Sequence, residues 1–336
     1  MISFVFCGLE PFVPFRVLPW LNSCLAVLLL LPLGAAAQAY PNRPVRIISP
    51  FAAGGSNDVV ARAIAPRLAA ALGQQFIVEN RPGAGGAIGT ELGAKSPPDG
   101  YTLTMVSNAT LAIIPALRQV PYDPVKDLAP VGLIGLSPYI VLVHPSLPVA
   151  SIRQLVALAA SRPEQVEFGS GGIGTPGHLA GAMLNTMTGI RMVHVPYRAG
   201  NLALIDLLGG NISVTFSTTI TSTQLIRTGK VRALAATSSK RIPAFPDLPT
   251  VAESGVPGYE FTLWLGLAAP AGTPDAALQQ LSAALTRLLL GKDVQEHLAA
   301  QSVDTLASTP QELAEKIRRD MIVYAKLVRD SGARAE

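Results

Sequence analysis

The chain has 336 residues, of which 49% are hydrophobic and only 14% are charged, and its formal net charge is +4. These values exclude a disordered chain or a long coiled coil, and they fit globular domains large enough to bury their own cores. Lysine and arginine do not cluster with aromatic residues, so we expect no nucleic-acid partner. The small positive charge favours anionic ligands.

The first 39 residues have the pattern of an export signal. An apolar run from Leu25 to Leu33 is followed by Ala37-Gln38-Ala39, a typical cleavage site of small residues. The run is too short to anchor the chain in a membrane. We therefore expect an exported protein that is cleaved near Ala39, and the long stretch before the run suggests a start codon placed too far upstream. Both cysteines, Cys7 and Cys24, would leave with this signal, so we expect no disulfide and no thiolate metal ligand in the mature chain.

A strand, a glycine turn and a helix are predicted between Pro44 and Leu72. The apolar residues from Val45 to Ile48 favour a short buried strand, and Gly54-Gly55 allows a tight turn. Ser56 or Asn57 is expected to cap the helix that follows. The free N–H groups at such a helix N-terminus favour anions, and an ordinary turn without a ligand is the alternative.

Strands and helices then alternate, which implies a parallel sheet with right-handed crossovers. Ser107 and Asn108 follow the third strand, so we expect them at the same carboxyl edge of the sheet as the loop from Phe51 to Asp58. Ligands bind at this edge in open α/β sheets, and a polar turn is the alternative. The predicted elements are a strand at 75–79, a glycine turn at 80–86, a helix at 87–94 and a strand at 101–106.

The second half of the chain repeats this architecture. A glycine loop from Gly171 to His178 again lies between a strand and a helix, with Thr175 as a suitable N-cap and Pro176 at the first helical position. The order of elements predicts a second α/β unit with its own anion-favouring helix N-terminus. These elements are a helix at 151–160, a strand at 166–170, a helix to about 187, a strand at 193–197, a helix at 202–208 and strands at 212–216 and 231–236.

Two apolar stretches are predicted to connect two lobes. Val131 to Val143 is broken at Ser137-Pro138 and leads into the second lobe, and Phe261 to Ala268 leads back. A capping box from Thr309 to Glu312 then begins the last helix. We therefore expect one lobe to contain residues 40–143 and 261–336, and the other to contain residues 144–260.

Catalytic and cofactor motifs are incomplete in this sequence. Gly169 to Gly174 fits the letters G-x-G-x-x-G, but no acidic residue follows about 20 positions later, which argues against a dinucleotide site. Neither Ser56 nor Ser170 fits the G-x-S-x-G pattern of serine hydrolases, and no two histidines have the spacing of a zinc site. Asp58 is interpreted as a partner of the helix dipole, with a general base as the alternative. We expect a binding protein with no catalytic residue, metal or cofactor.

A series of short motifs, in this order, resembles the Bug-type solute-binding proteins of tripartite tricarboxylate transporters. The resemblance implies an α/β fold of the type II periplasmic binding proteins (the Venus flytrap), with two lobes that are each a doubly wound sheet. It implies a periplasmic protein, expected to be a monomer, that captures a small carboxylate between its lobes and delivers it to the membrane permease subunits of such a transporter. The motifs are Tyr40 to Pro44, Pro50 to Asp58, Glu79 to Gly86, Pro98 to Thr102, Val195 to Tyr197, Leu207 to Gly210, Lys240 to Pro243 and Pro249 to Glu253.

The resemblance also implies that one loop from each lobe holds the carboxylate, largely through main-chain amides. Family members often have threonine where this chain has Asn57, a difference that alters side-chain contacts and leaves the amides. His178 either donates to the anion or is packed locally. A sensor that presents its ligand to a membrane receptor and a hydrolase on the same scaffold are the alternative functions. The candidate ligand-binding residues are Phe51, Ala53, Gly54, Gly55, Ser56, Asn57, Asp58, Ser107, Asn108, Ser170, Gly171, Gly174, Thr175, His178, Tyr197, Ser217 and Trp264.

Overall fold

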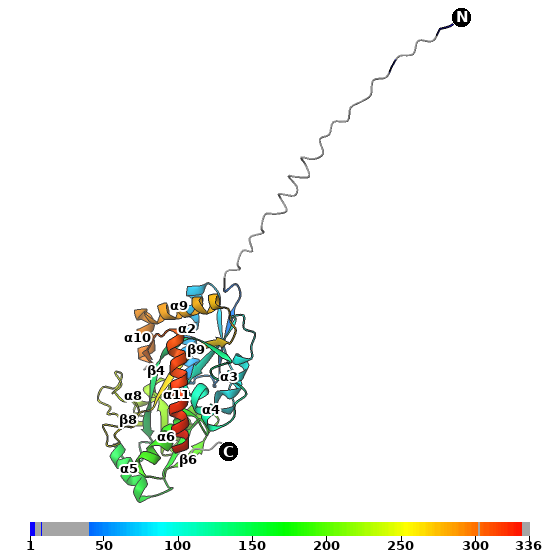
Figure 1. The fold of residues 1–336 in the computed structure, drawn as a ribbon. Coiled ribbons are helices and arrows are strands. Elements are labelled where there is room, and N and C mark those ends of the chain that lie inside the picture. The colour runs from blue at the N-terminus through cyan, green and yellow to red at the C-terminus, as the bar shows by residue number, and fades with distance from the viewer. Residues whose placement is uncertain (4–7, 9–39, 302, 331–336) are drawn as a thin grey trace. The chain divides into compact units, whose positions relative to one another are not determined.

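The structure is a computed structural model that describes residues 1–3, 8, 40–301 and 303–330 (Figure 1). The apolar run and the cleavage site of the expected signal peptide lie outside the described residues, as do both cysteines. The chain divides into two compact units, Met1–Tyr40 and Pro41–Glu336. Everything below concerns this second unit.

A sheet of ten strands runs through the unit, in the order β2-β1-β3-β9-β4-β7-β5-β6, and β8 and β10 also pair with β4. Its two ends are parallel and its middle is antiparallel, because β9 and β4 run against their neighbours. The strands are β1 (Val45–Ser49), β2 (Phe76–Asn80), β3 (Thr102–Ser107), β4 (Leu128–Val143), β5 (Glu167–Ser170), β6 (Val193–Pro196), β7 (Val214–Thr218), β8 (Arg232–Ala236), β9 (Thr262–Pro270) and β10 (Asp304–Thr305).

The first half of the sheet follows the predicted order of strand and helix. β1 lies between β2 and β3 and pairs in parallel with both, which confirms the predicted parallel sheet. Ile47 aligns with Val78 on one side and with Leu103 on the other, and Ile47 and Leu103 are fully buried. The helices here are α2 (Ser56–Leu72), α3 (Ala87–Ala94) and α4 (Ile114–Leu117), with the short helical turns η1 (Ala84–Gly86) and η2 (Ala109–Ile113).

The second half of the sheet is built in the same way. β5 lies between β6 and β7 and is parallel to both, as the repeated pattern predicted. Ser151 is the N-cap of α5 and accepts a hydrogen bond from the Gln154 amide, as expected for a capping serine. The helices are α5 (Ile152–Ser161), α6 (Pro176–Thr188), α7 (Gly200–Leu208) and α8 (Thr219–Arg227).

β4 is continuous through Ser137-Pro138, where the sequence suggested a break. Leu128 to Pro138 pair with β9, whereas Tyr139 to Val143 pair with β7 and β8. The two halves of the sheet therefore share β4, and the change of partner falls between Pro138 and Tyr139.

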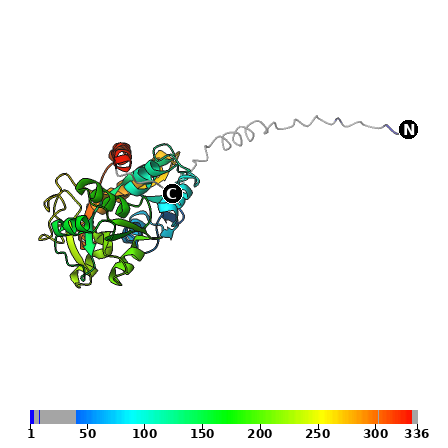
Figure 2. The same ribbon diagram turned by 90° about the horizontal axis from the view of Figure 1, so that it is seen from below.

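The C-terminal helices pack against the outside of the sheet. The predicted capping box begins α11 (Pro310–Asp330), because the Thr309 amide donates to Glu312 and the Glu312 amide donates to the Thr309 hydroxyl. α11 packs on β4, η2 and α4 and also reaches α6, and Figure 2 shows it at one edge of the unit. No helix in the described part of the chain is both long and apolar enough to cross a membrane. The other helices are α9 (Asp275–Leu289) and α10 (Lys292–Ala300).

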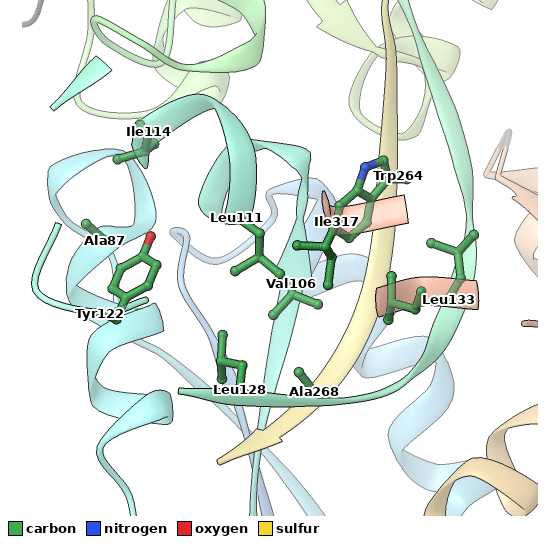
Figure 3. Packing of buried hydrophobic residues seen from close by; sticks show 11 residues of the cluster. Ala87, Val106, Leu111, Ile114, Tyr122, Leu128, Leu133, Trp264, Ala268 and Ile317 are labelled. Carbon is green, nitrogen blue, oxygen red and sulfur yellow. The ribbon is translucent and has the colours of Figure 1, made fainter. Parts of the chain in front are cut away.

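A cluster of apolar side chains lies between the first half of the sheet and α11 (Figure 3). Val106, Leu111 and Ile317 belong to this cluster, and each is at most 3% exposed. Trp264 of β9 also lies here at 1% exposure, and its indole Nε1 donates to Asp320 Oδ2 at 2.5 Å. This cluster fixes the strands whose ends carry the candidate site.

Candidate functional site

A cleft of about 160 Å³ lies where the carboxyl ends of parallel strands from both halves of the sheet meet. Ser107 ends β3, Ser170 ends β5 and Thr218 ends β7, and all three line the cleft. This is the edge at which open α/β sheets bind ligands. The other polar and glycine lining residues include Gly55, Ser56, Asn57, Gly83, Gly85, Gly86, Gly171, Thr175, Gly177, Arg198, Gly200, Asn201, Thr215, Ser217 and Thr221.

α2 begins at the cleft with unpaired backbone donors. Its N-cap is Gly55, and Val59 is the first residue whose amide bonds back to it, at 3.0 Å. Neither Ser56 nor Asn57 caps the helix, which corrects the expectation. The Ser56 hydroxyl instead bonds to Thr218 Oγ1 at 2.8 Å, across the cleft. Among the described residues no acceptor is bonded to the amides of Ser56 and Asn57, so both can donate to a ligand.

α6 begins at the opposite wall. Thr175 is its N-cap, as predicted, but the hydroxyl donates to the carbonyl of Gly172 at 2.7 Å and does not cap the helix. Pro176 has no N–H group, and Leu179 is the first residue whose amide bonds back to Thr175. The amide of Gly177, which lines the cleft, has no acceptor in the described part of the chain. It is therefore a second main-chain donor for an anion.

Two further helices begin at the same cleft. Ala199 is the N-cap of α7 and Thr218 is the N-cap of α8, and both residues are part of the lining. Each helix N-terminus carries a partial positive charge of roughly half an elementary charge. Among the described residues that line the cleft there is no aspartate or glutamate. Four helix N-termini that begin at a cleft whose described lining contains no carboxylate favour a bound anion.

Three of the four glycines that the sequence suggested for ligand binding have their amides bonded within the protein. Gly54 donates to Asp58 Oδ2 at 2.9 Å, Gly55 donates to the carbonyl of Ala52 at 3.1 Å, and Gly174 donates to His178 Nδ1 at 3.0 Å. Gly54 and Gly174 have φ of 78° and 77°, so glycine is required there for the turn itself. These residues shape the loops, and the free donors of Ser56, Asn57 and Gly177 lie one to three residues further along the chain.

Asp58 holds the first loop and does not face a ligand. Its Oδ1 accepts hydrogen bonds from Arg62 Nε and Asn80 Nδ2, both at 2.9 Å, and its Oδ2 accepts from Gly54. Asn80 also donates to the carbonyl of Phe51 at 3.1 Å. Burial raises the pKa of Asp58, but these hydrogen bonds outweigh it and the pKa is lowered overall. An ionised, fully bonded carboxylate is a structural anchor and a poor general base.

Several predicted site residues are not at the cleft. Trp264 is in the core cluster because its indole N–H is bonded to Asp320, so it cannot form a ligand wall. Asn108 is fully buried, and its Nδ2 donates to the carbonyl of Thr262 and to Tyr324 Oη. Tyr197 donates to Asp206 Oδ2 at 2.7 Å and is not part of the cleft lining. Ala53 is an exposed loop residue outside the lining.

Two buried polar groups in the lining have no partner. Asn57 is 4% exposed and Ser107 is 0% exposed, yet Asn57 Oδ1 and Ser107 Oγ form no hydrogen bond with the described residues. Leaving such a group unsatisfied costs about 1–3 kcal/mol. A ligand or an ordered water that bonds to them removes this cost. Both therefore support the cleft as a binding site.

A pair of stacked histidines lies behind the second loop. The rings of His178 and His194 are 4.0 Å apart, and Phe168 packs against both. Burial lowers the pKa of His178 to about 4 and that of His194 to about 3. Both are therefore neutral near pH 7, and His178 Nδ1 accepts from the Gly174 amide. Neither ring is part of the cleft lining, so the pair supports the loop and does not neutralise an anion.

These pKa values predict that stability falls in mild acid. Between about pH 6.5 and 4 the unfolded chain binds protons at His178 and His194 that the folded chain does not bind, so the free energy of unfolding should decrease as the pH falls through this range. Urea unfolding at several pH values measures this. His178→Asn should weaken this pH dependence, whereas His144→Asn, which removes a histidine bonded to Ser146 and outside the stacked pair, should leave it largely intact. If the free energy of unfolding of His178→Asn depends on pH as strongly as that of the unchanged protein, the effect does not come from the histidine pair.

Sequence reasoning missed part of the lining. Residues 82–86 and 198–201 and the hydroxyls of Thr218 and Thr221 line the cleft. The glycine turn at 80–86 was recognised, but only as a turn. α8 was not predicted, because its first residues, T-I-T-S-T, are rich in β-branched residues that have low helix propensity. A polar run directly after a predicted strand was the signal that could have suggested it.

The fold and the cleft together define a solute-binding protein of the periplasmic type. The profile of TctC, the tripartite tricarboxylate transporter family receptor, matches residues 60–332. Protein BugT of Bordetella pertussis (strain Tohama I) is 37% identical over 301 residues, which cover 89% of this chain and 92% of BugT. The chain belongs to the family of tripartite tricarboxylate transporter receptors.

Solved structures of similar proteins share the fold. The periplasmic binding protein BugD is 35% identical with a TM-score of 0.84, and the match covers 88% of this chain and 100% of that one. R. palustris Rpa4515 with adipate is 34% identical with a TM-score of 0.85, covering 87% and 98%. MatC from Rhodopseudomonas palustris with bound malate is 30% identical with a TM-score of 0.81, covering 86% and 100%.

Proposed function

We propose that this protein captures a small carboxylate in the cleft between its two lobes and delivers it to the membrane permease subunits of a tripartite tricarboxylate transporter. The observation that carries the proposal is the convergence of four helix N-termini on a cleft whose described lining contains no acidic side chain. Unpaired main-chain amides can hold a carboxylate without a buried cation. The adipate and malate in two similar structures support this ligand class.

We propose that residues 40–143 and 261–336 form one lobe and residues 144–260 the other. β4 pairs with β9 up to Pro138 and with β7 from Tyr139 onward. This change of partner supports a crossing from one lobe to the other within β4. The bond between Ser56 and Thr218 would then join the two lobes across the cleft. Ligand would draw the lobes together, as in hinged binding proteins. Small-angle scattering with and without a bound acid tests this closure. The radius of gyration should become smaller when the protein is saturated with ligand, unless the ligand-free protein is already closed.

We further propose that the chain is exported, cleaved near Ala39 and active in the periplasm. Its own sequence pattern and the periplasmic binding proteins among its relatives support this location. Mass spectrometry of the secreted protein should give a chain that begins at or near Tyr40. Recovery of the uncleaved chain alone would contradict it.

A hydrolase is less well supported than a binding protein, although Ser170 of the cleft lining contacts a histidine behind it. Ser170 Oγ lies 2.6 Å from His194 Nε2. Burial holds the pKa of His194 near 3, which makes its imidazole a weak general base at neutral pH. Among the described residues no carboxylate orients this histidine. Ser170 also bonds to the backbone of Gly172 and to Thr175, so its hydroxyl organises the loop.

A ligand screen tests the proposed function. Thermal unfolding of the cleaved protein should shift upward with at least one small carboxylate from a panel of malate, succinate, adipate, aspartate and benzoate, because a ligand that binds only the folded state stabilises it. The corresponding amides and alcohols serve as uncharged controls. Equal shifts with acids and uncharged controls, or no shift with any acid, would overturn the carboxylate proposal.

A further inference from the structure

We propose that Arg118 is a positioning residue for ligand binding, because it holds residues 82–86 in a strained conformation in which they form one wall of the cleft. This role rests on the proposed function, since Arg118 would shape the binding site without contacting the ligand. Residues 82–86 all line the cleft. Arg118 directly follows α4 and is not part of the cleft lining; it borders only the wider space outside the cleft.

The glycine turn at this wall contains four successive residues with positive φ. Glycine adopts positive φ without strain, whereas the left-handed region disfavours alanine about five- to thirtyfold. Ala84 and Glu164 are the only described residues other than glycine that have positive φ. Ala84 is therefore the strained residue of the turn, and the turn needs a restraint from outside. The four φ values are 137° at Gly83, 49° at Ala84, 65° at Gly85 and 102° at Gly86.

The Arg118 side chain supplies this restraint. Its Nη2 donates a hydrogen bond to the carbonyl oxygen of Ala84, which also accepts the amide of Ala87. No other side chain in the described part of the chain is hydrogen-bonded to residues 82–85. A bond from a guanidinium group is charge-assisted and therefore stronger than a bond between neutral groups. Arg118 thus fixes the carbonyl of the one strained residue.

The turn in its held conformation supports the loop before α2. Gly86 lies so close to Phe51 that a Cβ atom at Gly86 would be 2.9 Å from Phe51 Cζ. Phe51 lines the cleft and precedes the N-terminus of α2, whose amides are proposed ligand donors. On the side of α4, a Cβ atom at Gly85 would be 2.6 Å from Ile114 Cδ1. The turn is wedged between α4 and Phe51, so a change in its conformation would move a wall of the cleft and leave the Phe51 ring without support.

Hydrogen exchange in the ligand-free protein tests whether Arg118 holds the turn. The probe is the amide of Gly86, which bonds to the carbonyl of Gly83 at 2.9 Å within the turn. Arg118→Gln should speed its exchange at least about tenfold, because the turn opens more often without the restraint. Arg191→Gln is the matched control, since it removes an exposed arginine that contacts Glu164 at 3.3 Å and does not line the cleft. Equal exchange rates in the unchanged protein and in Arg118→Gln would overturn the proposal.

Calorimetric titration tests whether the held turn matters for binding. The probe is whichever of malate, succinate, adipate, aspartate and benzoate binds the unchanged protein most tightly. Arg118→Gln should lower the affinity for this acid at least about fivefold, whereas in an Ala84→Gly protein the same change should lower it no more than about twofold. The reason is that glycine adopts positive φ without a restraint. An arginine that contacted the acid, or attracted it by charge, would cost the same affinity in both backgrounds.

The possible results separate this role from the proposed function. Equal losses of affinity in the two backgrounds, or no loss in either, would overturn the positioning role of Arg118 while leaving carboxylate capture intact. If none of the five acids binds the unchanged protein, the proposed function is wrong and the positioning role is wrong with it, whatever the exchange rates are. Circular dichroism of each variant establishes that it is folded.

Discussion

Ser56→Pro is expected to reduce carboxylate affinity at least about tenfold more than Ser56→Ala. Both changes remove the hydroxyl that bonds to Thr218, but only proline removes the backbone N–H at the start of α2. A hydrogen bond to a charged group contributes about 1.5–3 kcal/mol, which is tenfold or more in affinity. The comparison of the two variants therefore isolates one main-chain donor.

Proline should fit this position without disturbing the fold. Ser56 is the first residue of α2, where proline is favoured and where no backbone bond would be lost. Gly55 has φ of −77° and ψ of 165°, an extended conformation that suits the residue before a proline. Titration with the tightest acid of the panel measures the effect, and thermal unfolding checks folding. A folded Ser56→Pro protein that binds like Ser56→Ala would show that this amide is not a ligand donor.

Asp58→Ala is expected to lower the free energy of unfolding by about 3 kcal/mol and to weaken carboxylate binding strongly. The change removes the buried carboxylate that accepts hydrogen bonds from the Gly54 amide, the Asn80 side chain and Arg62. A hydrogen bond to a charged group contributes about 1.5–3 kcal/mol, and less where the donor is exposed. Because Asn80 also holds the carbonyl of Phe51, the whole loop before α2 would lose its anchor.

Urea unfolding and calorimetric titration measure the two effects of Asp58→Ala. Asp293→Ala is the matched control, since its carboxylate is 76% exposed and its contact with Arg67 is long at 3.5 Å; we expect it to change stability by less than about 0.5 kcal/mol. The lowered pKa of Asp58 adds an acid dependence: its contribution is present above about pH 3.8 and is lost as the pH falls through its folded pKa. Loss of stability without loss of binding would limit Asp58 to the fold.

Structural features that depend on residues close together in the chain could be predicted from the sequence. The apolar strand, glycine turn and helix between Val45 and Leu72 are as predicted, since β-branched runs and positive-φ glycines act locally. The capping box at Thr309 and the cap at Ser151 are also local, and both are confirmed. The repeated pattern and the ordered motifs led to the correct fold and family.

Contacts between distant residues could not be predicted in this way. Ser56 does not cap α2, because its hydroxyl meets Thr218, which is 162 positions away. Trp264 was expected in the ligand wall because of the family resemblance, but Asp320 of α11 accepts its indole N–H in the core. The glycine amides were assigned to the ligand because their acceptors, Asp58 and His178, could not be identified from spacing. Tertiary partners decide which donors stay free.

A carboxylate held by backbone donors at the start of α2 and α6, as proposed, would affect how such a protein evolves. An amide N–H is present whichever side chain the residue carries, proline excepted. Substitutions around the cleft can therefore change which acid fits while the groups that hold its carboxylate are retained. A new preference can arise through single steps at side chains such as Asn57 or Arg198, and none of the intermediates has to lose the ability to capture an acid.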